Sequence, residues 1–100
     1  MSVSQVRRLL VAYDIPDDPR RSRLAKVLGS YGDRVQYSVS VVDATPVRIA
    51  RLRRAVEKMI VLTEDSVLIC DLGLARGVES HRFLCLGLQR DVTGADSFVV

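Results

Sequence analysis

The chain has 100 residues, of which 48% are hydrophobic and 27% are charged, and its formal net charge at pH 7 is +3. This length and composition predict one globular domain over residues 1–100 that buries a core without disulfides, and they exclude a disordered chain. The apolar runs are too short for a signal peptide or a membrane span, so we expect a cytoplasmic protein.

The first predicted elements are a strand and a helix. Residues 9–13 are apolar on both alternating faces, which is typical of a central strand covered on both sides. Asp18 is then a good helix N-cap and Pro19 a good first residue, and an apolar stripe with helical spacing extends to Tyr31. We expect Gly32 to end this helix.

A second strand and a second helix are predicted next. Residues 34–42 alternate between apolar and polar side chains with the period of a strand. Thr45 and Pro46 predict the start of a helix whose apolar stripe covers residues 49–60. The far side of this helix carries basic residues, namely Arg51, Arg54 and Lys58.

The last third of the chain is predicted to add strands. Residues 66–72 and 82–88 are strand-like and a polar loop separates them. This order leaves one strand between the helices, whereas a ferredoxin-like fold needs two, so we expect the strand at residues 34–43 to bend or split near residues 40–42. The predicted fold is an α+β ferredoxin-like sandwich, with two helices on one face of an antiparallel sheet, plus a short C-terminal strand at residues 96–100.

The second face of this sheet is predicted to be apolar and must be buried by another element or chain. Two helices cover only one face, yet the strands at residues 9–13 and 66–72 are apolar on both faces. A two-fold homodimer that packs sheet against sheet would bury the other face. The apolar end of the chain is a candidate for pairing with an exposed strand edge of the second copy.

Asp14 is the residue that most suggests chemistry, because it directly follows a predicted buried strand. A carboxylate in such a place is costly unless it is paired, hydrogen-bonded or bound to a metal. Two interpretations are open. Asp14 accepts hydrogen bonds from backbone N–H groups of the following turn, which the spacing alone favours. Alternatively, two copies of Asp14 meet across a two-fold axis and bind a divalent cation such as Mg²⁺, which would activate water against a phosphodiester.

Three arginines follow this carboxylate in an unusual place. Arg20, Arg21 and Arg23 lie in the first turns of the first predicted helix, where the helix macrodipole disfavours cations. Free N–H groups at a helix N-terminus can also bind phosphate. The arginines therefore indicate either an anionic ligand or a solvated charged surface.

Several motifs occur in a characteristic order: VAYDIPDD, RRSRLAKVLGSYG, DRVQYSV and DSVLICDLG, followed by a short apolar C-terminus. Together they resemble the CRISPR-associated protein two family, the small spacer-acquisition proteins that partner the CRISPR integrase. The resemblance implies a ferredoxin-like homodimer in which Asp14 is the catalytic residue and binds a divalent metal, Mg²⁺ or Mn²⁺, with Tyr13 in support. It also implies that Arg21, Arg23 and Arg34 contact RNA or double-stranded DNA.

The resemblance further implies that the C-terminal strand at residues 96–100 crosses to the other subunit or docks the integrase.

Two places depart from the family pattern. Ser40 stands where an aromatic residue is frequent, which removes any substrate contact of that aromatic ring, and Cys70 and Asp71 stand where an aromatic and an apolar residue are frequent. Neither departure affects Asp14.

Two functions fit these features. The first is a Mg²⁺-dependent endonuclease that hydrolyses phosphodiester bonds of single-stranded RNA or double-stranded DNA and takes part in CRISPR spacer acquisition. The second is a non-catalytic dimeric scaffold that bridges integrase dimers and binds protospacer DNA. The sequence leaves both functions open.

Overall fold

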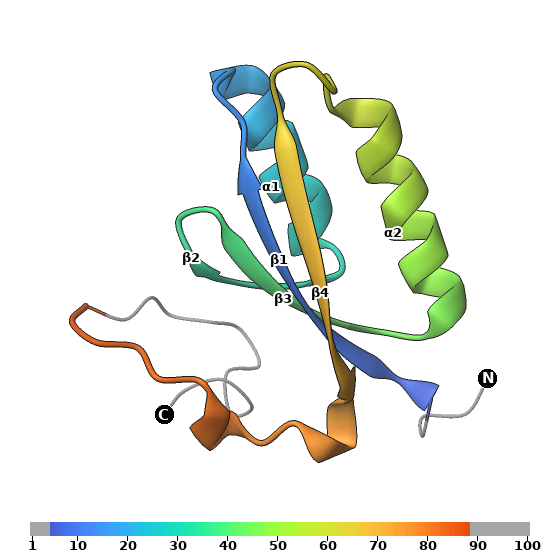
Figure 1. Ribbon diagram of the computed structural model, residues 1–100, viewed down its shortest axis with the longest axis vertical. Helices are drawn as coiled ribbons and strands as arrows, with labels where there is room; N and C mark the ends of the chain where they lie inside the picture. The colour runs from blue at the N-terminus through green and yellow to red at the C-terminus, as the bar shows by residue number, and fades with distance from the viewer. Residues whose placement is uncertain (1–4, 89–100) are drawn as a thin grey trace.

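A computed structural model describes residues 5–88 of this protein, so the C-terminal strand predicted at residues 96–100 lies outside the described residues. The elements follow in the order β1 (Arg7–Asp14), α1 (Asp18–Gly29), β2 (Gly32–Gln36), β3 (Val39–Ala44), α2 (Pro46–Met59) and β4 (Ser66–Leu74), with two short 3₁₀ turns after β4 (Figure 1). Two strands stand between the helices, as the ferredoxin-like α+β prediction requires. Neither helix has the length and apolar composition that a membrane span needs.

The sheet has the order β2-β3-β1-β4, and every neighbouring pair is antiparallel. β1 is therefore an inner strand, as predicted. The long strand predicted after α1 does split, but at Tyr37 and Ser38 instead of residues 40–42. The split comes earlier because the whole of β3, from Val39 to Ala44, is needed to pair with β1.

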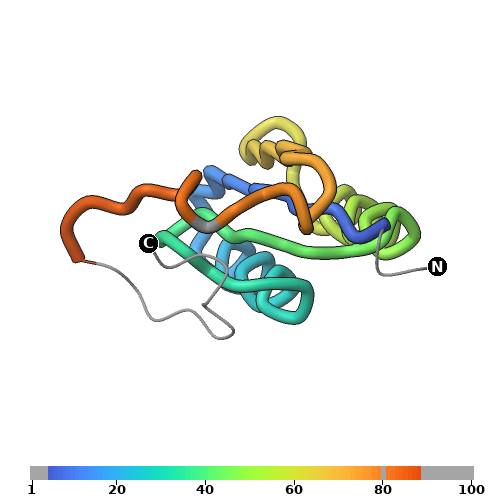
Figure 2. Tube along the Cα trace, turned by 90° about the horizontal axis from the view of Figure 1, so that it is seen from below, coloured from blue at the N-terminus to red at the C-terminus, as the bar shows by residue number. Residues whose placement is uncertain are grey.

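Both helices pack on the same face of the sheet, and α1 lies on one side of the strands in Figure 2. The core combines alternate residues of β1 with the apolar stripes of the two helices: Leu9, Val11, Tyr13, Leu24, Leu28, Leu52 and Val56. Because successive side chains of a strand point to opposite faces, Leu10, Ala12 and Asp14 lie on the other face, which we call the open face.

The chain after β4 lies against part of the open face. Arg8, which is buried, binds Asp43 of β3 through two hydrogen bonds of 2.7 Å and donates a third, of 2.9 Å, to the carbonyl oxygen of Val78. Residues 82–88 do not form the predicted strand. No strand within residues 5–88 pairs with this segment, and Leu84, Leu86 and Leu88 are exposed.

The ends of α1 differ from the prediction. Asp17, not Asp18, is the N-cap, and its carboxylate accepts a 2.9 Å hydrogen bond from the backbone N–H of Arg20. The helix ends at Gly29, and Gly32 instead begins β2, where a Cβ atom would lie 2.1 Å from the carbonyl oxygen of Val41. Gly32 is thus required for the close approach of β2 to β3.

Candidate functional site

Asp14 is exposed at the end of β1 and lies on the open face, opposite Ser66 of β4. Among residues 5–88, no group forms a hydrogen bond or an ion pair with its carboxylate. The interpretation that Asp14 caps the following turn is therefore wrong, because Asp17 performs that role. The exposure of Asp14 also removes the desolvation cost that the sequence suggested, and leaves its two oxygens available to a ligand.

The metal-binding prediction can be tested against the donors near this carboxylate. In the part of the chain that the structure describes, no three His, Cys, Asp or Glu side chains cluster closely enough to hold a metal ion. Mg²⁺ usually keeps several waters and takes only one or two carboxylates from the protein. The Asp14 carboxylate, alone or together with that of a second copy, fits such an ion, because bound water would fill the other ligand positions.

A small polar cavity of about 100 Å³ lies on the opposite side of β1, between α1 and the β2–β3 hairpin. Its lining brings together three of the residues predicted from the sequence, Tyr13, Arg21 and Arg34. No carboxylate is part of the lining, which also includes Ser22, Ala25 and Tyr37. Two guanidinium groups and two phenols around a small space are suited to an anion such as a phosphate group.

Tyr37 connects the two arginines of this cavity, and the sequence did not point to it. The guanidinium carbons of Arg21 and Arg34 lie 5.7 Å and 5.3 Å from the centre of its ring, which is within the range of a cation–π interaction. The ring is 57% exposed. Its position three residues after Arg34, in a chain with few aromatic residues, was the available signal.

The environment of Tyr13 keeps its hydroxyl protonated. Burial raises the pKa of Tyr13, and the nearby positive charges of Arg34 and Arg21 act in the opposite direction without cancelling this effect. The hydroxyl lies 3.5 Å from the carbonyl oxygen of Tyr37. At neutral pH the phenol is therefore a hydrogen-bond donor at the edge of the cavity.

Two of the three α1 arginines have carboxylate partners. Arg20 makes hydrogen bonds of 2.5 Å and 2.9 Å with Asp65, whose side chain is completely buried. Arg21 binds Asp18 and the carbonyl oxygen of Ile15. The third arginine, Arg23, is exposed and does not line the cavity. The suggestion of an anionic ligand is thus wrong for Arg20, because Asp65 already neutralises it.

The comparison with protein families supports the resemblance seen in the sequence. The model of the family described as CRISPR associated protein Cas2 matches residues 7–76, a range that includes β1, both helices and β4. The chain belongs to the Cas2 family. Asp14, Tyr13 and all the arginines discussed above lie inside the matched range.

Curated relatives carry nuclease names. This Cas2 chain is 46% identical over 57 residues to a CRISPR-associated endoribonuclease Cas2 of Thermus thermophilus, and the aligned part covers 57% of this chain and 61% of that relative. It is 36% identical over 70 residues to the endoribonuclease Cas2 of Geobacter sulfurreducens, covering 70% and 74% of the two chains. The chain thus spans about three fifths of the length of the Thermus relative.

Solved structures share the fold. A hypothetical protein of Thermus thermophilus, TT1823, is 36% identical, with a TM-score of 0.73 over 87% of this chain and 98% of its own. The Cas2 protein of Streptococcus pyogenes, solved at pH 6.5, is 28% identical, with a TM-score of 0.72 over 80% and 99%. The ferredoxin-like prediction is therefore confirmed by both the element order and these structures.

Proposed function

We propose that this Cas2 chain is a metal-dependent endonuclease that hydrolyses phosphodiester bonds of RNA or double-stranded DNA and takes part in CRISPR spacer acquisition. The observation that carries the proposal is the exposed carboxylate of Asp14, which no described residue binds. The relatives named endoribonuclease and endonuclease support the same class of reaction. The predicted cytoplasmic location stays a prediction.

Asp14 would act with its copy in a homodimer. Mg²⁺ or Mn²⁺ held between the two carboxylates would lower the pKa of a bound water molecule and so supply a nucleophile. Tyr13 and Asp14 are neighbours in β1 and point to opposite faces of the sheet. Arg21 and Arg34 would therefore bind a part of the nucleic-acid backbone that lies across β1 from the reacting bond, while Asp14 orients the water.

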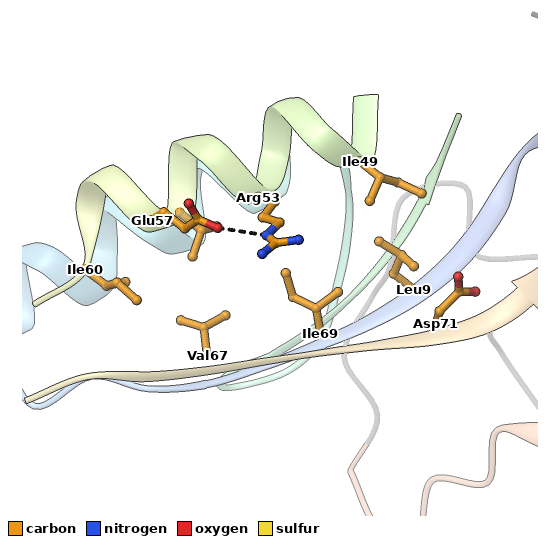
Figure 3. A pocket seen from close by; sticks show the side chains of 9 residues that line it. Leu9, Ile49, Arg53, Glu57, Ile60, Val67, Ile69 and Asp71 are labelled. Atoms are coloured by element: carbon orange, nitrogen blue, oxygen red, sulfur yellow. Dashed lines mark hydrogen bonds and ion pairs between the residues drawn. The ribbon is translucent and has the colours of Figure 1, made fainter. Parts of the chain in front are cut away.

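The open face and the free edge of the sheet support the homodimer. Leu68 on the open face is 61% exposed, and exposed leucines follow in residues 84–88. β4 is an edge strand of the sheet. An apolar groove of about 440 Å³ lies between β4 and α2 beside this edge (Figure 3). Light scattering of a micromolar solution checks the proposal, and a stable monomer would contradict it.

Asp14→Asn tests the catalytic role. The substitution keeps the size of the side chain but removes the charge that holds the metal, so we expect metal-dependent cleavage of RNA and duplex DNA to be abolished while the dimer stays folded. Asp33→Asn is the matched control, because Asp33 also lies on the open face but on the edge strand β2. Cleavage by the Asp14→Asn protein, measured on gels with added Mg²⁺, would refute the assignment.

A non-catalytic scaffold that bridges integrase dimers and holds protospacer DNA is the second candidate. It is favoured by the finding that no cluster of three or more metal-binding side chains exists among the described residues. The discriminating measurement is spacer acquisition in cells. If Asp14→Asn leaves acquisition intact and deletion of residues 96–100 blocks it, scaffolding is the biological role.

A further inference from the structure

The positive charge of this protein is concentrated on α2. This helix contains five basic residues and one acidic residue, so the remaining ten basic and eleven acidic residues of the chain carry a net charge of −1. The first turn of α2 has no acidic residue to offset the charge. The net charge of +3 therefore comes from this helix alone.

Three of these cations form a stripe on the outer side of α2, which we call the α2 stripe: Arg51, Arg54 and Lys58. Their spacing of three and four residues places them on one side of the helix, opposite the buried residues Leu52 and Val56. All three are exposed. The stripe extends about 10 Å along the helix axis, which corresponds to about three nucleotides of one strand of a duplex.

The cations of the stripe have no acidic partner among residues 5–88. The single acidic residue of α2, Glu57, binds Arg53 instead, with a distance of 2.8 Å between Arg53 Nε and Glu57 Oε1. Figure 3 shows this pair beside the groove between α2 and β4, with Arg53 pointing toward the strands. Like charges three and four residues apart destabilise a helix, so the stripe is unfavourable for the isolated chain.

We infer that the α2 stripe is a second nucleic-acid contact, which binds consecutive backbone phosphates of a duplex without reading its sequence. Three exposed cations in a row neutralise phosphates and release condensed counterions. Arginine is also well suited to bidentate phosphate contacts. The inference rests on the proposed binding of nucleic acid, and it adds a surface that is separate from Asp14 and from the cavity at Tyr13.

The test compares two triple variants that lower the charge equally. The first is Arg51→Gln/Arg54→Gln/Lys58→Gln, and the control is Lys26→Gln/Arg76→Gln/Arg82→Gln, which changes exposed cations outside α2. Fluorescence anisotropy with EDTA measures the affinity for a short duplex DNA between about 50 and 200 mM salt. EDTA prevents cleavage, so the readout is binding alone.

We expect the α2 variant to bind duplex DNA on the order of a hundredfold more weakly at about 150 mM salt, because each lost contact costs roughly fivefold. The slope of log K against log salt should become shallower by about 2.7, or 0.9 for each cation. The control should change the slope by less than about 0.9, the value for one phosphate contact, because salt screens distant charges. Thermal melting of the α2 variant should be no lower than that of the unaltered protein.

Two results would overturn the inference. An unchanged slope for the α2 variant would leave an acidic protein surface as the partner of the stripe. An equal loss in the control would show that net charge alone drives binding. If Asp14→Asn still abolishes cleavage, either result leaves the proposed nuclease function standing. If Asp14→Asn still cleaves and the α2 variant binds weakly, the nuclease proposal is refuted and the inference about the α2 stripe is supported.

Discussion

The arginines of α1 and α2 look alike in the sequence but have different surroundings in the fold. Arg20 and Arg21 of α1 bind Asp65 and Asp18, whereas Arg51 and Arg54 of α2 have no acidic partner in the described chain. Asp65 reaches Arg20 from 45 residues away. The difference shows that an arginine indicates an anionic ligand only after the carboxylates that the fold brings to it are known.

Of the substitutions that compare the arginines of α1 and α2, Arg20→Gln is expected to have the largest effect on stability. This substitution leaves the buried carboxylate of Asp65 with the backbone N–H of Val61, at 2.8 Å, as its one partner among residues 5–88. An unpaired buried charge is strongly unfavourable, so we expect the thermal midpoint of unfolding to fall by several degrees. Arg23→Gln is the control, because Arg23 is exposed on the same helix. An equal fall in the thermal midpoint for both variants would show that the ion pair of Arg20 with Asp65 does not stabilise the fold more than an exposed arginine does.

A smaller effect should appear when the pH is lowered. The hydrogen bonds from Arg20 and from Val61 N–H lower the pKa of Asp65 below its ordinary value. The stabilisation is therefore complete above the pKa of the unfolded chain, about 3.9, and is lost as the pH falls toward the lower pKa of the folded state. Urea midpoints should converge for the unaltered protein and Arg20→Gln below about pH 4. A constant difference across this range would contradict the assigned cause.

The smallest effect has the opposite sign and concerns α2. Arg54 lies three residues after Arg51 and four before Lys58, so Arg54→Gln removes two like-charge pairs and should stabilise the folded chain by about 0.5 kcal/mol. Arg53→Gln removes the exposed pair with Glu57 and should cost about 0.3 kcal/mol. Urea denaturation at low salt measures both changes. A loss of stability in Arg54→Gln would mean that this arginine has a structural partner.

The helices and most strands could be predicted from the sequence because their signals are local. The apolar stripes of α1 and α2 and the double-sided pattern of β1 are present within each segment. The strand predicted at residues 82–88 failed for the opposite reason. Alternating leucines suit a strand, but a strand also needs a neighbour with which to pair, and no neighbour can be read from the segment itself.

The site was predictable in part. The family resemblance identified Asp14, and the fold then showed that its carboxylate is exposed and does not cap the next turn. Tyr13, Arg21 and Arg34 were named from the sequence, and the fold places all three around one cavity. Tyr37 was missed because its role depends on two arginines that approach its ring from different elements.

Arg8 sets an order of events in folding. It holds Asp43, 35 residues later, and the carbonyl oxygen of Val78, 70 residues later. Closing a long loop costs entropy, and the pairing of β1 with β4 brings Leu74 to Arg7, so we expect the segment around Val78 to dock after these two strands have paired. In the native state, the segment around Val78 can therefore open while the strands stay paired. Amide protons near Val78 should exchange through this local opening, which leaves the sheet intact.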